Sequence, residues 1–202
     1  MIGIIDYDAG NLKSVEKALH YLGEPCTVTR DREEILAADK LILPGVGAFG
    51  EAVKKLKMYG LDQVIKEAVS ENKPFLGICL GMQLMFESSE ESPGVPGLGL
   101  LPGKILKIPA GPGLKIPHIG WNSLIFPKKG RLFLGLSQNT YVYFVHSYYL
   151  QAGCEKDVAA ETKYGVSIDA AVERESLFGC QFHPEKSGDA GLRILKNFAE
   201  LG

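Results

Sequence analysis

Residues 74–83 constrain the fold of this chain more than any other segment. They read Pro-Phe-Leu-Gly-Ile-Cys-Leu-Gly-Met-Gln, so an apolar strand pattern passes through Gly-x-Cys-x-Gly directly into a helical pattern. A nucleophile on a sharp strand-to-helix turn needs this order, because the flanking glycines permit close approach of the backbone. The N-terminus of the following helix favours the thiolate form of cysteine. The segment therefore predicts that Cys79 is a nucleophile, and the alternative is a buried core cysteine between two unrelated glycines.

The composition is that of a globular enzyme or binding protein. The chain has 202 residues, 46% hydrophobic and 23% charged, and we expect residues 1–202 to form one domain. The net charge of −2 argues against a nucleic-acid partner and favours small molecules or protein surfaces. No apolar stretch has the length of a membrane span, and residues 1–6 resemble a short strand more than a signal peptide. The four cysteines show no CxxC spacing, so we expect no metal site, no disulfide framework and a cytoplasmic location.

The first half of the chain alternates strand and helix patterns. Asn11 and Asp31 stand where they can cap the first two helices. The strands are apolar without polar alternation, which indicates burial on both faces of a parallel sheet. We expect strands at residues 2–7, 26–30, 41–43 and 75–79, and helices at 12–22, after Asp31, and at 50–57, 61–72 and 80–88.

The second half changes character. Residues 93–117 are rich in Gly and Pro, and longer strand patterns follow, with a turn at Tyr164-Gly165. We expect strands at residues 104–108, 141–150, 158–164, 167–174 and 177–182, and a final helix at 189–201. The predicted fold is α/β, with a mostly parallel central sheet, helices on both faces, and an extension of antiparallel strands.

A thiol nucleophile needs a base, and the base needs an orienting group. His183 stands in Gln-Phe-His-Pro-Glu just after a predicted strand. Residues two apart in an extended chain point the same way, so Glu185 can reach back to the imidazole, and Pro184 fixes φ between them. The alternative is an unrelated His and Glu in a loop. An ordinary α/β-hydrolase is disfavoured, because there the acid precedes the histidine.

A glycine-rich segment at residues 45–50 allows two interpretations. Its Gly-Val-Gly-Ala-Phe-Gly sequence matches the dinucleotide fingerprint, but the next strand ends in Cys79 and not in an acidic residue. We therefore favour the second interpretation, in which this segment lines the site beside the thiol. The backbone N–H of Val46 or Gly47, together with that of Leu80, would then stabilise an oxyanion.

Three motifs together resemble the class I, triad-type glutamine amidotransferases. They are Pro-Gly-Val-Gly at 44–47, Gly-Ile-Cys-Leu-Gly-Met-Gln at 77–83 and His-Pro-Glu at 183–185. Segments 117–122, 143–148 and 183–187 are similar to the glutaminase subunits of imidazole glycerol phosphate synthase in histidine biosynthesis. The resemblance implies a flavodoxin-like fold without a cofactor. It also implies that Cys79 attacks the glutamine carboxamide, His183 transfers the proton, and Glu185 holds His183.

The resemblance also implies substrate and partner contacts. Four residues match positions that hold the amino-acid end of glutamine: Gln83, Glu91, Ser147 and Tyr148. The alternatives are a surface amide for Gln83 and a solvated charge for Glu91. Ammonia would pass to a (β/α)₈-barrel cyclase in a heterodimer. Candidates for the docking face or its signalling are Asn11, His118, Trp121, Asn122 and Lys186, although Trp121 could instead be a core or loop anchor.

Three other functions remain open from the sequence. The chain could be a glutaminase that serves another synthase, such as one making pyridoxal phosphate or anthranilate. It could be a cysteine hydrolase of the peptidase or γ-glutamyl hydrolase kind, which would need no partner. A non-catalytic module with the same fold is the third alternative, and an intact Cys79, His183 and Glu185 argues against it.

Overall fold

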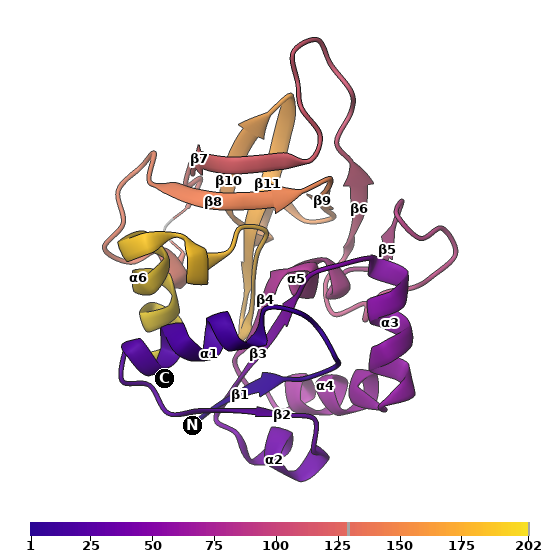
Figure 1. Ribbon diagram of the computed structural model, residues 1–202, viewed down its shortest axis with the longest axis vertical. Coiled ribbons are helices and arrows are strands. Elements are labelled where there is room, and N and C mark those ends of the chain that lie inside the picture. Colours follow the sequence, from indigo (N-terminus) through magenta and orange to yellow (C-terminus); the bar gives the residue numbers. More distant parts are fainter. Residues whose placement is uncertain (129, 202) are drawn as a thin grey trace.

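The computed structural model describes residues 1–128 and 130–201. A seven-stranded sheet forms its centre, in the order β10-β11-β12-β4-β3-β1-β2 (Figure 1). Strands β12, β4, β3, β1 and β2 are parallel, and β11 and β10 extend the sheet in antiparallel pairing, which confirms the predicted α/β fold. The strands are β1 (Ile2–Ile5), β2 (Cys26–Thr29), β3 (Lys40–Gly45), β4 (Phe75–Cys79), β10 (Val158–Tyr164), β11 (Val166–Arg174) and β12 (Leu177–Cys180).

Helices cover both faces of this sheet (Figure 1). They are α1 (Leu12–Tyr21), α2 (Arg32–Ala37), α3 (Phe49–Met58), α4 (Leu61–Ser70), α5 (Leu80–Leu84) and α6 (Gly188–Ala199). Strand β3 shows why the sheet strands are apolar throughout. Leu41 and Leu43 pack in one core layer with α3 and α4, whereas Ile42 between them packs in the other layer with α1 and α6.

Two small sheets stand beside the central one. They are formed by β5 (Ser88–Ser89), β6 (Gly103–Lys107) and β9 (Tyr148–Ala152), and by β7 (His118–Ser123) and β8 (Tyr141–His146). The predicted strand at 141–150 is therefore two strands, divided at Ser147, because β8 pairs with β7 and β9 pairs with β6. Strand β7 was not predicted. Short 3₁₀ helices occur at η1 (Arg131–Phe133), η2 (Glu155–Asp157) and η3 (Pro184–Lys186).

Two further local predictions were wrong. The helix expected to reach residue 88 ends at Leu84, because the carbonyls of residues 84–86 accept hydrogen bonds from the amides of residues 98–101. Asn11 occupies the N-cap position of α1 in a left-handed conformation, but its side chain does not cap the helix. It donates to Glu185 instead. Asp31 does cap α2, accepting from the amides of Glu33 at 2.9 Å and Glu34 at 3.0 Å.

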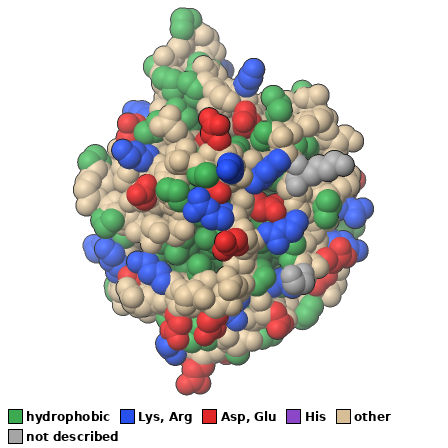
Figure 2. All heavy atoms as spheres, turned by 180° about the vertical axis from the view of Figure 1, so that it is seen from behind, with side chains coloured by type: hydrophobic (Ala, Val, Ile, Leu, Met, Phe, Trp, Pro, Cys, Tyr) green, Lys and Arg blue, Asp and Glu red, His purple; other side chains and the backbone are tan. Residues whose placement is uncertain are grey.

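The surface seen from behind carries mixed charge. Lys and Arg side chains alternate there with Asp and Glu, and no extended area of one sign appears on this face (Figure 2). Among the described helices, none combines the length and the apolar character needed to cross a membrane.

Candidate active site

Cys79 is the last residue of β4 and lies on a strained turn. Its backbone has φ 54° and ψ −111°, a region that residues other than glycine rarely adopt. A Cβ atom on Gly77 would stand 2.7 Å from the backbone of Met82, and one on Gly81 would stand 1.7 Å from the carbonyl oxygen of Leu43. Both glycines are therefore required by close backbone packing around the turn. The strand-to-helix turn expected from the sequence is confirmed.

His183 and Glu185 form a buried pair just after β12. The Nδ1 atom of His183 lies 2.7 Å from Oε1 of Glu185, and both side chains are at most 1% exposed. The amide of Asn11 donates to the same carboxylate oxygen. The main chain of His183 is fixed as well, because its carbonyl accepts from Ser187 Oγ at 2.6 Å and its amide donates to Tyr143 at 2.9 Å. The orientation of the imidazole is thus held from several sides.

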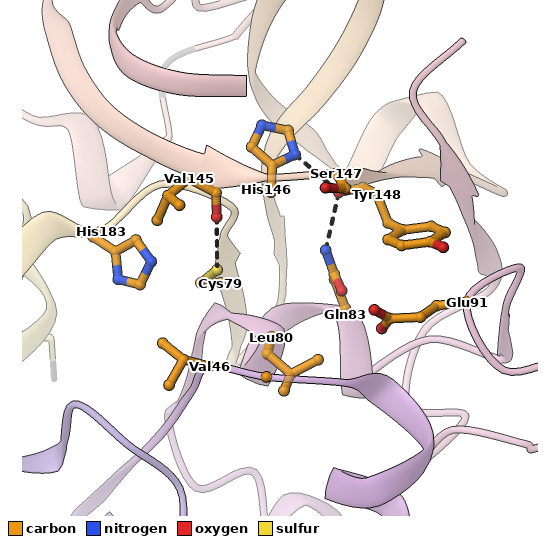
Figure 3. A pocket seen from close by; sticks show the side chains of 11 residues that line it. Val46, Cys79, Leu80, Gln83, Glu91, Val145, His146, Ser147, Tyr148 and His183 are labelled. Carbon is orange, nitrogen blue, oxygen red and sulfur yellow. Dashed lines mark hydrogen bonds between the residues drawn. The ribbon is translucent and has the colours of Figure 1, made fainter. Parts of the chain in front are cut away.

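The charge on His183 depends on its two partners. Burial lowers the pKa of His183, but its interactions with Cys79 and Glu185 outweigh burial and raise the pKa to about 9. His183 is therefore an imidazolium at neutral pH. Cys79 and His183 both line the same pocket (Figure 3).

This pocket has a volume of about 250 Å³. It brings together segments that are far apart in the sequence: the loop after β3, the turn after β4, and the junction of β8 and β9. All the predicted oxyanion and substrate residues line it, as do two of the three triad residues. The lining residues are Val46, Gly47, Cys79, Leu80, Gln83, Glu91, Val145, His146, Ser147, Tyr148 and His183.

The glycine-rich segment lies directly beside the thiol. Gly45 is paired with Cys79 in the register of β3 and β4, which brings Val46 and Gly47 to the rim of the pocket. Gly45 itself packs on a buried tyrosine, since a Cβ there would stand 2.2 Å from the Tyr7 hydroxyl. Gly47 has φ +107°, a conformation suited to glycine. This position favours the oxyanion interpretation of the segment over the dinucleotide interpretation.

Two of the four residues expected to bind substrate, Gln83 and Glu91, have side chains that are held in place by hydrogen bonds. Gln83 is buried and its amide nitrogen donates to the Tyr148 carbonyl at 3.1 Å, so the surface-amide alternative is wrong. The Oε2 atom of Glu91 accepts from the amide of Phe49 at 2.7 Å, at the start of α3. Its carboxylate is therefore anchored at the pocket and is not a free solvated charge.

The candidate partner residues divide into exposed and buried groups. Trp121 on β7 is 55% exposed, which excludes a core role, and Lys186 in η3 is also exposed. Asn11 and Asn122 are half-buried. His118 is only 3% exposed, so its side chain is not available for docking, and that part of the prediction is wrong, whereas a role in signalling stays a prediction. The physical reason is that its ring stacks between Phe144 and Tyr164, at centroid distances of 4.8 and 3.9 Å.

Sequence reasoning missed one residue next to the sulfur. The Nε2 atom of Gln181 lies 3.6 Å from Sγ of Cys79 and can donate to it. The available signal was a glutamine in an otherwise apolar strand end, two residues before His183. Residues 1–128 and 130–201 contain no cluster of His, Cys, Asp and Glu suited to hold a metal ion.

Comparison with known proteins places the chain in a family. The model of the family "Glutamine amidotransferase class-I" matches residues 3–201. The "Imidazole glycerol phosphate synthase subunit HisH" of Moorella thermoacetica is 52% identical over 200 residues, covering 99% of this chain and 94% of that relative. The protein of the same name from Methanothermobacter thermautotrophicus is 49% identical over 201 residues, covering 100% and 98%.

Solved structures agree on the fold. One described as a crystal structure of glutamine amidotransferase has a TM-score of 0.76 at 21% identity and covers 98% of both chains. A glutaminase domain of CTPS from Trypanosoma brucei has a TM-score of 0.67 at 18% identity, covering 100% of this chain and 94% of that one. The chain therefore belongs to the class-I glutamine amidotransferase family and, within it, to the HisH subunits of imidazole glycerol phosphate synthase.

Proposed function

We propose that this glutaminase subunit hydrolyses glutamine through a thioester on Cys79, with His183 as the acid and base and Glu185 as its orienting group. One observation carries the assignment. Cys79 stands on a strained turn in the pocket that His183 lines, and His183 is backed at 2.7 Å by the buried carboxylate of Glu185. A nucleophile, a base and an orienting group in this order are what acyl transfer from an amide requires.

The first half-reaction forms the thioester. The Cys79 thiolate attacks the carboxamide carbon, a C–S bond forms, and the carbonyl π electrons move onto oxygen. The backbone N–H of Leu80 and that of Val46 or Gly47 stabilise this oxyanion, at about 3–4 kcal/mol per donor. His183 then gives its proton to the amide nitrogen, the C–N bond breaks, and ammonia leaves.

The second half-reaction releases glutamate. Neutral His183 takes a proton from water, the hydroxide oxygen attacks the thioester carbon, and the same N–H groups stabilise the second oxyanion. The C–S bond then breaks, and the sulfur leaves as the thiolate paired with the imidazolium. The raised pKa of His183, about 9, favours this charged resting pair at neutral pH.

The amino-acid end of glutamine is assigned to the far side of the pocket. The carboxylate of Glu91, anchored by the Phe49 amide, is suited to the substrate ammonium. Gln83 uses its N–H groups on Tyr148 and Gln181, which leaves its carbonyl oxygen to accept from substrate. Ser147 and Tyr148 line the same wall and complete the proposed substrate contacts.

We further propose that ammonia passes to a (β/α)₈-barrel cyclase bound as a heterodimer. The cyclase converts a phosphoribulosyl aminoimidazole carboxamide nucleotide to imidazole glycerol phosphate and an aminoimidazole carboxamide ribonucleotide in L-histidine biosynthesis. The exposed Trp121 and Ile119 on β7, with exposed Lys186, support a docking face near the pocket. The reducing cytoplasm is the proposed location, since it keeps Cys79 a thiol.

Assays of the complex of this chain with the cyclase, with Cys79 intact or substituted, test this function. Cys79→Ala is expected to abolish synthesis from glutamine and to retain synthesis from added ammonia. Loss of both activities in a folded complex would mean that Cys79 has only a structural role. Glutamine hydrolysis by the unmodified chain is expected to rise strongly when the cyclase and its nucleotide are added. High turnover without the cyclase would favour a hydrolase or a glutaminase for another synthase.

A further inference from the structure

Two buried histidines near the pocket take no part in the proposed chemistry. His118 on β7 and His146 on β8 face each other in the register of their strands, and Nδ1 of His118 lies 2.9 Å from Nε2 of His146. They are 3% and 6% exposed. We call them the histidine pair. The pair belongs to a longer chain of hydrogen bonds that runs from β10 to the sulfur of Cys79.

The outer part of this chain has a fixed direction, because a backbone carbonyl only accepts. Asn122 donates through Nδ2 to the carbonyl of Lys163 at 3.0 Å, and the same nitrogen faces Nε2 of His118 at 3.3 Å. Nε2 of His118 must therefore be the acceptor, and its proton must be on Nδ1. At the other end, His146 Nδ1 lies 2.8 Å from the carbonyl of Tyr148 and must donate to it. Nε2 of His146 is then the acceptor for His118.

The inner part begins at the same carbonyl. Gln83 Nε2 donates to Tyr148 O at 3.1 Å and to Oε1 of Gln181 at 2.9 Å (Figure 3 shows the bonds to Tyr148). Because Gln181 presents its oxygen to Gln83, it must present its N–H₂ group to Cys79. A donor directed at the sulfur favours the thiolate over the thiol. The carbonyls of Lys163 and Tyr148 can only accept, and they therefore fix the donor and the acceptor in every hydrogen bond between Asn122 and Cys79.

We propose that His118 and His146 are positioning residues that hold the Tyr148 carbonyl, and through Gln83 and Gln181 keep an N–H donor directed at the sulfur of Cys79. The inference rests on the proposed role of Cys79 as nucleophile. The inference requires both imidazole rings to be neutral, because a second proton on either ring removes a nitrogen acceptor from this series of hydrogen bonds.

The surroundings of the pair meet this requirement. Burial lowers the pKa of His118 to about 4 and that of His146 to about 3, so both are neutral at pH 7. The ring of His118 is also clamped between Phe144 and Tyr164, with interplanar angles of 20° and 18°. This stacking fixes the direction of its Nδ1–H toward His146.

The tautomers can be read directly in the unmodified chain. Nitrogen-15 NMR of the histidine rings at pH 7 is expected to show His118 and His146 as neutral Nδ1–H tautomers. Free neutral histidine prefers the Nε2–H form, so the expected result is distinctive. An Nε2–H or doubly protonated ring at either position would overturn the proposal without any substitution.

The effect on the sulfur is tested with His118→Phe. Phenylalanine keeps the aromatic stack but lacks the donor to His146. Alkylation of Cys79 by iodoacetamide, followed by peptide mass spectrometry, is expected to slow about threefold to tenfold, the range of one hydrogen bond. The half-buried Cys26 and Cys154 serve as internal references.

The matched control is Tyr164→Phe, which alters the other side of the same stack and leaves the chain of bonds intact. It is expected to react within about twofold of the unmodified chain. Equal alkylation rates in folded His118→Phe and the unmodified chain would contradict the proposal. Glutamine hydrolysis is assayed separately, and its absence from the unmodified complex would count against the proposed function. The tautomers and the alkylation rates test only the proposed role of the histidine pair.

Discussion

His183 and His146 both line the pocket, and both are buried, yet His183 is charged at neutral pH and His146 is neutral. His183 is 1% exposed and His146 is 6% exposed. Burial acts on both in the same direction, but the pKa of His183 is raised to about 9 whereas that of His146 is lowered to about 3. The difference lies in their partners. Glu185 and Cys79 face His183, whereas His146 faces a carbonyl oxygen and a neutral imidazole.

Interactions with Cys79 and Glu185 together reverse the effect of burial at His183, and His146 has no such partners. At His183 the charged form is favoured, which suits an imidazolium that later donates a proton. At His146 the neutral form is favoured, which suits a fixed hydrogen-bond direction. Histidine is thus suited to its proposed role in proton transfer at position 183 and to its proposed positioning role at position 146.

The largest effect is expected from substitution of His183 itself. His183→Gln removes the proposed base and proton donor, so glutamine hydrolysis by the complex should fall by about 10⁴-fold or more. His146→Gln should cost only about tenfold, because no proton passes through His146. Steady-state ammonia release measures both. Equal losses of hydrolysis in the two variants would contradict the assignment of different roles to His183 and His146.

Glu185→Gln tests the cause of the charge on His183. The substitution keeps the size of the side chain and removes its charge, so the pKa of His183 should fall, because only Cys79 then opposes the effect of burial. Hydrolysis of glutamine should drop by about 10³-fold. Nitrogen-15 NMR of the His183 ring across a pH series checks the change in its pKa. An unchanged pKa of His183 would mean that the carboxylate does not stabilise the imidazolium.

The free energy of unfolding should depend on pH in two opposite ways, one from the histidine pair and one from His183. For the histidine pair the pKa values in the fold lie below the ordinary value of 6.5, so the unfolded chain binds more protons and stability falls as pH drops from 6.5 toward 4. The loss at pH 5 is about 2 kcal/mol per histidine. For His183 the sign is opposite, since its contribution is complete below 6.5 and is lost as pH rises through about 9.

Urea unfolding at pH 5, 6.5 and 8.5 separates the two contributions. His146→Gln should flatten the acidic side of the stability curve, and His183→Gln should flatten the alkaline side. If His183→Gln flattened the acidic side, the assigned charges would be reversed.

The smallest effect is expected from Asn11, which donates to the carboxylate behind His183. Asn11→Gly removes this donor and suits the φ of 75° at that position. The kcat for glutamine hydrolysis should fall about threefold, with KM nearly unchanged, because the carboxylate keeps its bond to His183. A loss as large as that of Glu185→Gln would show that Asn11 has a larger share in holding the imidazole.

The sequence predicted what local patterns encode. The apolar strands, the turn at Cys79 and the two-residue spacing of His183 and Glu185 each depend on neighbouring residues, and the structure has them as expected. The break at Ser147 and the strand β7 depend on which distant strand supplies the hydrogen bonds. No local pattern contains that information.

The same reason explains the errors at the site. Trp121 and His118 lie in one short segment, and both were predicted to serve the docking face or its signalling, but only Trp121 is exposed. His118 is covered by Phe144 and Tyr164, which come from other strands. Gln181 reaches the sulfur only because β12 lies beside β4. Tertiary packing determines which of these side chains are exposed and which reach the sulfur, whereas a sequence motif identifies only the segments that lie near the site.

Cys79 is the proposed nucleophile, and covalent labelling is the direct test of this role. The complex is treated with a diazo-ketone analogue of glutamine and each cysteine peptide is examined by mass spectrometry. We expect one added label, on Cys79, and none after Cys79→Ala. Cys180 is fully buried and burial raises its pKa, so it should stay unmodified. A label on Cys180, or no label on Cys79 in the presence of the cyclase, would contradict the account.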